Sequence, residues 1–258
     1  MEKVTTTETA MGTEPSEKKI YSFLRRFSTL IGLFLISAVL SFTSEHFLSF
    51  ENFLNILLQN ANIAILAVGM TMVIILGEID LSVGGVEALG CVVAAWMMVY
   101  GGLGIIPSII LALVAGTLCG LVSGFFVAYF RFHSFVSTLA MMGISRGFAL
   151  IYTHGASIYG LPDSFRFIGQ GSIGHIPVPI LIAAVALLLG HLLLIQFRLG
   201  NHIYAVGGNI EAARLSGINV GRVKLIVLSI SGFCGALAGV IMASRLNSGQ
   251  ERLERQIF

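Results

Sequence analysis

Three acidic residues in the most apolar part of the chain are the first candidates for chemistry. Glu78 and Asp80 follow a long apolar run, and Glu87 lies inside the next one. Paired carboxylates can act as general acid and base, or cut peptides within a membrane. Glu78 and Asp80 are only two residues apart, however, and no second acidic motif stands on a distant segment. We therefore expect no catalytic residues.

Metal and nucleotide chemistry also lack their usual patterns. The three cysteines (Cys91, Cys119 and Cys234) lie in apolar segments without CxxC or Cys/His spacing, which favours small buried hydrophobes. The six histidines are scattered and lack metal-ligand spacing. The pair Gly207-Gly208 belongs to neither GxxxxGK[ST] nor GxGxxG. We expect no metal and no cofactor, and any ATP has to be bound by another chain.

The composition predicts an all-α, polytopic membrane protein. Of the 258 residues, 56% are hydrophobic and 11% charged, and the mean hydropathy is +0.91. A typical soluble domain is about 25% charged, so this chain cannot cover its own surface with polar groups. The net charge of +2 and the lack of a Lys/Arg-rich run argue against a nucleic-acid partner.

Hydropathy and charge together predict the topology. A membrane-spanning helix needs roughly 20 apolar residues. Seven segments qualify: 27–44, 60–77, 82–100, 105–130, 133–152, 177–197 and 225–243. Four basic residues between positions 18 and 26 precede the first one, which predicts that the tail 1–26 is cytosolic. Six spans then return the basic loop 198–224 to the cytosol and leave the connection 153–176 outside.

A polar stripe enters the second span. Asn55, Gln59 and Asn62 stand at i, i+4 and i+7, so they share one face of a helix. Such a stripe has to face other helices, a cavity or the interface. Two interpretations stay open: the residues line a substrate path, or they join helices by hydrogen bonds.

A break between helices is expected near Glu78. Gly77, Gly84 and Gly85 flank the acids, and Asp80 or Ser82 is placed to cap the helix that follows. The alternative for these two residues is a direct role in transport, because intramembrane acids are costly and commonly functional.

The loop 198–224 carries a second pattern. Glu211, Ala212 and Ala213 begin a short helical segment, and Gly217 can end it in a left-handed turn. A short helix at a membrane surface exposes an apolar face unless something covers it. The cover is either a groove of a soluble subunit or the lipid surface.

Two stretches identify a family by resemblance. The segment Gly69–Gly85 reads GMTMVIILGEIDLSVGG, and Leu199–Ile218 contains IYAVGGNIEAARLSGI. Both resemble motifs of the permease subunits of bacterial ABC importers for ribose and similar monosaccharides. The chain departs from the family pattern at Glu78, where Gly is usual, and at Gly85, where Ser is usual. The resemblance covers about residues 53–250.

The resemblance implies a function and a set of partners. Glu211, Ala212, Ala213 and Gly217 would lie where the permease meets the ATP-binding cassette subunit, which hydrolyses the ATP. A second permease subunit would complete the sugar path, and a periplasmic binding protein would deliver the sugar. The location implied is the bacterial inner membrane. The alternative is a secondary transporter or channel that uses its own acids, with proton coupling through Asp80.

The end of the chain departs from the family. Members usually continue past Ser-Gly-Gln at 248–250 with about three further spans, roughly ten in all, whereas this chain ends in ERLERQIF. We therefore expect a permease domain over 27–244 and a divergent tail over 245–258. A chain of seven spans would leave its last helix without neighbours, so a truncated and non-functional fragment is a further alternative.

Overall fold

The computed structural model describes residues 16–247, with side chains from Phe27 onward. The chain divides into two compact units, with the boundary between Phe53 and Leu54. The first unit contains α1 (Ser16–Thr43), a helix with exposed Leu33, Phe34 and Phe42. Such an apolar surface suits lipid contact.

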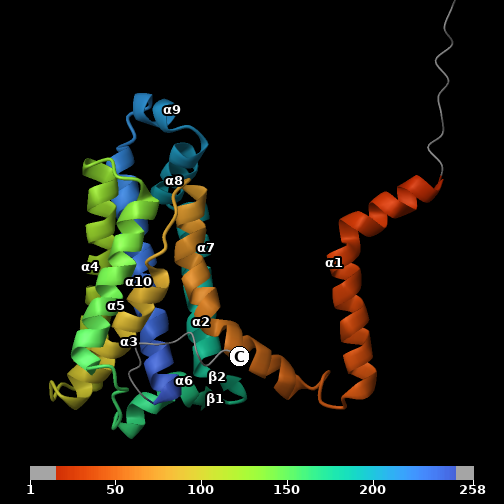
Figure 1. Cartoon of the computed structure of the whole chain (residues 1–258), viewed down its shortest axis with the longest axis horizontal. Coiled ribbons are helices and arrows are strands. Elements are labelled where there is room, and N and C mark those ends of the chain that lie inside the picture. The colour runs from red at the N-terminus through yellow and green to blue at the C-terminus, as the bar shows by residue number, and fades with distance from the viewer. Residues whose placement is uncertain (1–15, 248–258) are drawn as a thin grey trace, which may run out of the picture. The chain divides into compact units, whose positions relative to one another are not determined.

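The second unit is a bundle of helices (Figure 1). Its helices in chain order are α2 (Phe50–Ile75, which begins just before the boundary), α3 (Val83–Val99), α4 (Ile105–Tyr129), α5 (Ser134–Thr153), η1 (Asp163–Phe165), α6 (Arg166–Gln170), α7 (Val178–Gln196), α8 (Arg198–Gly208), α9 (Ile210–Leu215) and α10 (Val220–Leu246). The strands β1 (Ser172–Ile173) and β2 (Ile176–Pro177) form a small antiparallel hairpin before α7.

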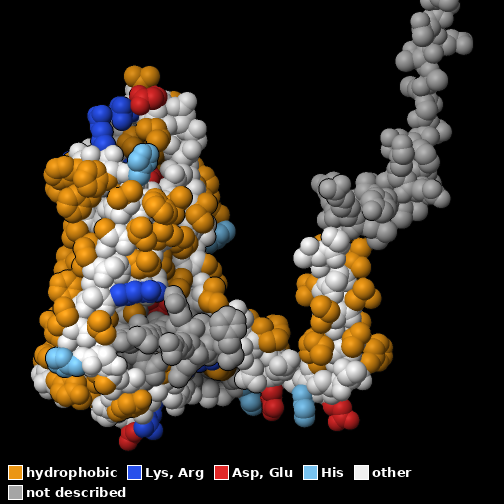
Figure 2. Space-filling model, in the orientation of Figure 1, with side chains coloured by type: hydrophobic (Ala, Val, Ile, Leu, Met, Phe, Trp, Pro, Cys, Tyr) orange, Lys and Arg blue, Asp and Glu red, His pale blue; other side chains and the backbone are white. Residues whose placement is uncertain are grey.

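The predicted all-α membrane fold is confirmed. Within the described residues, α2, α4, α5, α7 and α10 are long and apolar enough to cross a membrane, and the segments Phe27–Thr43 and Val83–Val99 are shorter apolar helices. The seven predicted spans correspond to these helices. Figure 2 shows hydrophobic side chains over the flank of the bundle, as a lipid-facing surface requires.

Helix α10 lies at the centre of the packing, so the expectation that the last span lacks neighbours is wrong. It packs against α3, α4 and α6, and most of its apolar stretch is buried. The reason is its complement of small residues. A side chain at Gly120 would overlap the carbonyl oxygen of Leu228, and one at Gly232 would overlap that of Gly116. Glycines at these positions let the α4 and α10 backbones approach closely.

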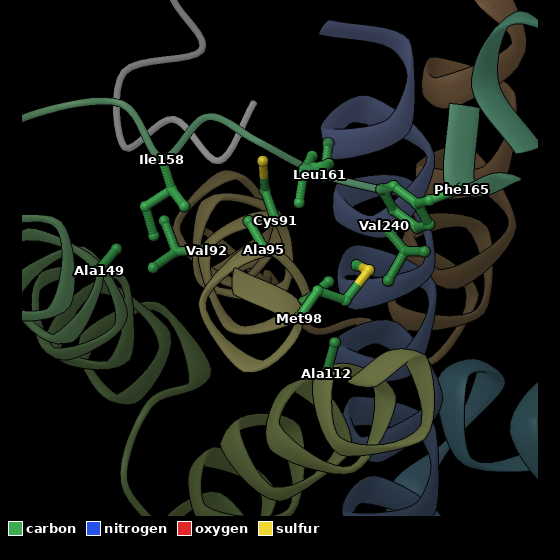
Figure 3. Packing of buried hydrophobic residues seen from close by; sticks show 12 residues of the cluster. Cys91, Val92, Ala95, Met98, Ala112, Ala149, Ile158, Leu161, Phe165 and Val240 are labelled. Carbon is green, nitrogen blue, oxygen red and sulfur yellow. The ribbon is translucent and has the colours of Figure 1, made fainter. Parts of the chain in front are cut away.

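The connection between α5 and α7 is folded onto one end of the bundle. Ile158, Leu161 and Phe165 of this connection pack with residues of α3, α4, α5 and α10 in one hydrophobic cluster (Figure 3). The hydroxyl of Ser244 on α10 donates to the carbonyl oxygen of Phe165 at 2.6 Å and accepts from the Gly169 amide at 2.7 Å. This end of α10 is therefore covered by protein.

Candidate functional site

The predicted break between the second and third spans is present. Helix α2 ends at Ile75, Gly77 adopts a φ of +80°, and α3 begins at Val83. A left-handed backbone at this position suits glycine and no β-branched residue. We call residues 76–82 the α2–α3 connection.

Asp80 organises the buried interior of this connection. Its Oδ1 accepts hydrogen bonds from the Ser82 amide at 2.8 Å and the Ser82 hydroxyl at 2.6 Å, and its Oδ2 accepts from the Ser231 hydroxyl of α10 at 2.6 Å. Asp80 is 3% exposed. Three donors satisfy a charge that would otherwise be costly to bury.

The capping prediction needs correction for Ser82. Ser82 occupies the N-cap position of α3, but its side chain makes no hydrogen bond to the first turn of the helix. Its hydroxyl is directed to Asp80 instead. The backbone of Ser82 is already helical, with φ −75° and ψ −15°, whereas a residue that caps through its side chain is usually extended, and this explains the difference.

Hydroxyl groups of α5 hold the other side of the α2–α3 connection. Ser134 Oγ accepts from the Ile79 amide at 3.0 Å, and Thr138 Oγ1 accepts from the Leu81 amide at 3.1 Å. These amides lie outside any helix and need partners where water is scarce. The connection is therefore bonded to both α5 and α10.

Glu78 forms an ion pair with Lys224 in the second turn of α10. The two side chains are 12% and 17% exposed, so most of the pair is withdrawn from solvent. Sequence reasoning placed Lys224 only within a basic loop and missed this pairing, since the partners lie far apart in the chain. The available signal for this pairing was that the loop 198–224 has more basic than acidic residues, while Glu78 follows an apolar run and has no basic residue near it in the sequence.

The polar stripe of α2 splits between two environments. Asn55 and Gln59 are exposed, whereas Asn62 is buried. The Asn62 amide donates to Glu87 Oε1 on α3 at 3.4 Å and to the Ala238 carbonyl oxygen on α10 at 3.3 Å. Asn62 therefore joins helices by hydrogen bonds, which was one of the two interpretations of the stripe. The role of the three residues in a substrate path stays a prediction.

The short helix expected in the basic loop is also present, as α9. Asn209 caps it, accepting a hydrogen bond from the Ala212 amide at 3.0 Å. After the helix, Gly217 adopts a φ of +81°, and the Ile218 amide donates to the Ala213 carbonyl oxygen at 3.0 Å. This is the left-handed ending predicted from the sequence. The preceding helix α8, in contrast, was not predicted.

The residues of α9 face in two directions. Ala213 is 4% exposed and packs into the bundle, so its side chain anchors the helix. Glu211 and Ala212 are exposed, and Leu215 is 89% exposed at the end of α9. Glu211 pairs with Arg214 at 3.1 Å on the surface. Figure 2 shows acidic and basic side chains gathered at this end of the bundle.

A hydrophobic cluster joins the base of α9 to α2 and α10. Its buried members are Met72, Val73, Leu76, Val127, Ile203, Val206, Ala213, Val223, Val227 and Leu228. Gly207 of α8 lies so close to α2 that a Cβ there would overlap the Ile75 carbonyl oxygen. The two sequence motifs, at 69–85 and 199–218, are therefore parts of one packed structure.

The family follows from comparison with known proteins. Residues 52–255 match the family described as branched-chain amino acid transport system / permease component. The chain belongs to this permease family. The match begins within a residue of the segment that the motifs predicted.

Individual relatives of this permease are known from several bacteria. The chain is 43% identical to the ribose import permease protein RbsC of Haemophilus influenzae over 93% of its length and 75% of the relative's. It is 37% identical to the RbsC of Bacillus subtilis, over 92% and 74%. Its identity to the D-allose transport system permease protein AlsC of Escherichia coli is 33%, over 94% and 76%. No solved structure matches significantly.

The described residues hold helices in position and offer a surface for another protein. Within the part of the chain that the structure describes, no three His, Cys, Asp or Glu side chains are grouped to hold a metal ion. The buried carboxylate of Asp80 is occupied by serine groups. The exposed end of α9 combines an apolar side chain with an ion pair, which is a surface that another protein can cover.

Proposed function

We propose that this permease is the membrane-spanning subunit of an ATP-driven importer for ribose or a related pentose or hexose. The observation that carries the proposal is the 43% identity to a ribose import permease over 93% of the chain. Ribose relatives have 37–43% identity, a galactofuranose relative has 39% and the allose relative has 33%. These relatives favour a monosaccharide substrate, and the relative with 43% identity is a ribose permease.

A separate ATP-binding cassette subunit hydrolyses the ATP and meets the permease at α9. Exposed Glu211, Ala212 and Leu215 supply the contact surface, and buried Ala213 fixes α9 to the hydrophobic cluster beneath it. The turn at Gly217 sets the direction in which the chain leaves α9. A helix docked in a groove of a soluble partner is a recurrent way to join two proteins.

The other partners follow from the same transport cycle. A second permease subunit encloses the sugar path, a periplasmic binding protein delivers the sugar, and lipid of the bacterial inner membrane covers the flanks. The cytosolic placement of the N-terminus and of α9 rests on the basic residues before the first span and in the loop 198–224.

Co-purification with the ATP-binding subunit of a ribose importer tests the docking. We expect Glu211→Lys and Gly217→Pro to weaken the association by reversing a surface charge and by excluding the φ of +81°. Asp163→Lys is the matched control, since Asp163 also forms a surface pair, with Arg166 at 3.5 Å. Arg166 begins α6, and α6 lies at the end of the bundle opposite to α9 (Figure 1). Unchanged association in both α9 variants would contradict the docking role.

A secondary transporter is the competing function, and the buried acids Asp80 and Glu87 are the observation in its favour. Uptake into proteoliposomes separates the two. The importer requires ATP and the binding protein, whereas a secondary transporter follows a proton gradient without either. Uptake that persists after ATP is removed would overturn the proposal.

A further inference from the structure

The α2–α3 connection is held from three sides. Helix α5 bonds its backbone through Ser134 and Thr138, α10 bonds it through Ser231, and α8 packs on the end of α2 through Gly207. The ion pair between Glu78 and Lys224 is a fourth attachment, nearest to the beginning of α10. A segment fixed in this way can follow the movement of the helices attached to it.

We propose that Glu78 and Lys224 are a positioning pair that makes the α2–α3 connection move with α9 and the first turns of α10. The proposal rests on the proposed function, in which the ATP-binding subunit displaces α9. The pair passes that displacement to the α2–α3 connection, and so to the end of α2 and the beginning of α3. In this way the movement that ATP hydrolysis causes at α9 reaches the membrane-spanning helices.

The path from α9 to Lys224 is short and internally bonded. The turn after α9 is closed by the hydrogen bond from the Ile218 amide to the Ala213 carbonyl oxygen. Helix α10 then begins at Val220 and is capped by Asn219, which accepts from the Arg222 amide at 3.0 Å. Lys224 therefore lies one turn into a helix whose start is tied directly to α9.

Lys224 differs from the other basic side chains of this loop. Arg214 and Arg222 are exposed, and Arg214 pairs with Glu211 on α9 itself. Lys224 is directed to a residue of another segment and is largely withdrawn from solvent. An ion pair is stronger where water is reduced, so this pair can transmit a displacement where a surface pair cannot.

The remaining contacts explain why the pair is a coupling element and not the main support of the fold. Without it, the connection keeps its hydrogen bonds to Ser134, Thr138 and Ser231. Those bonds attach it to α5 and to a position on α10 about two turns further along. The connection would stay folded and bonded to α10 at Ser231, but it would lose its direct attachment to the first turns of α10, which adjoin α9.

A neutral double variant tests the pair without leaving a buried charge unpaired. Glu78→Gln combined with Lys224→Met removes the attraction and conserves much of the volume. In the complex reconstituted with the ATP-binding subunit and the binding protein, we expect assembly and ATP hydrolysis to persist. We expect sugar uptake per ATP hydrolysed to fall about tenfold. Unchanged uptake per ATP in this variant would overturn the proposal.

Charge reversal adds a rescue experiment. Glu78→Lys or Lys224→Glu alone places two like charges together and should lower uptake per ATP, while the two together restore the attraction and most of the coupling. Arg222→Glu is the matched control, because it reverses an exposed charge two residues away on the same helix. An equal loss in the control would show that net charge, and not the pair, is responsible.

Different results would contradict the proposed function and the role of the Glu78–Lys224 pair. If the unaltered chain neither binds the ATP-binding subunit nor takes up sugar with ATP, the proposed function is wrong. If it does both and the neutral double variant is as well coupled as the unaltered chain, only the role of the pair is wrong.

Discussion

The α2–α3 connection and helix α9 are both polar interruptions between apolar helices, and they use a carboxylate in opposite ways. Asp80 of the connection is buried and accepts three hydrogen bonds from serine groups. Glu211 of α9 is exposed and holds only a surface pair with Arg214. The first arrangement fixes helices to one another, and the second leaves a surface for a partner. Substitutions in the two regions should therefore separate stability from association.

The largest effect is expected for Asp80→Ala. The change leaves the Ser82 amide and the Ser231 hydroxyl buried without their acceptor, and we expect it to lower the free energy of unfolding by about 3 kcal/mol. Chemical unfolding in detergent micelles measures it. Glu211→Ala, the exposed counterpart, should cost under about 0.5 kcal/mol. Equal losses in the two variants would remove the distinction between the regions.

Gly207→Val should have the next largest effect, because it tests the packing that joins the two regions. The added side chain overlaps the Ile75 carbonyl oxygen, and we expect a loss of about 2 kcal/mol from forced separation of α8 and α2. Gly208→Ala is the control, since a Cβ there has open space around it. A thermal unfolding temperature that is unchanged in Gly207→Val would contradict the close approach.

Gly217→Ala should produce a smaller loss. The left-handed backbone at this position costs an alanine about 1 kcal/mol, and the strain lies next to α9. We expect a small drop in stability with a clear drop in co-purification of the ATP-binding subunit. A drop in stability alone would mean that the turn does not orient the docking surface.

Leu215→Ser should leave stability nearly unchanged. The side chain is 89% exposed, so its loss removes almost no packing within the chain. We expect weaker association with the ATP-binding subunit, measured by co-purification at several salt concentrations. Association as strong as that of the unaltered chain would remove Leu215 from the contact.

Patterns among neighbouring residues predicted the helices better than they predicted the contacts between helices. Hydropathy was sufficient to place the seven apolar helices, and the sequence around Glu211 and Gly217 predicted α9 because a short helix and its left-handed ending depend on adjacent residues. The pairing of Glu78 with Lys224 and of Asp80 with Ser231 depends on how distant segments pack. Helix α8 was missed because its polar and basic residues resemble a loop.

The same limit explains the error over α10. Its last neighbours, Phe165 and Gly169, come from a connection that shows no strong pattern of its own in the sequence. The predicted division into a permease domain at 27–244 and a tail at 245–258 stays a prediction, and residues 248–258 lie outside the described part of the chain.

The proposed function requires α9 to lie in the cytosol, within reach of the ATP-binding subunit. Labelling of Leu215→Cys with a membrane-impermeant maleimide tests this directly, in a background in which Cys91, Cys119 and Cys234 are replaced. We expect labelling in inside-out vesicles, protection when the ATP-binding subunit is bound, and no labelling in right-side-out vesicles. Labelling from the external side in right-side-out vesicles would contradict the cytosolic location of α9.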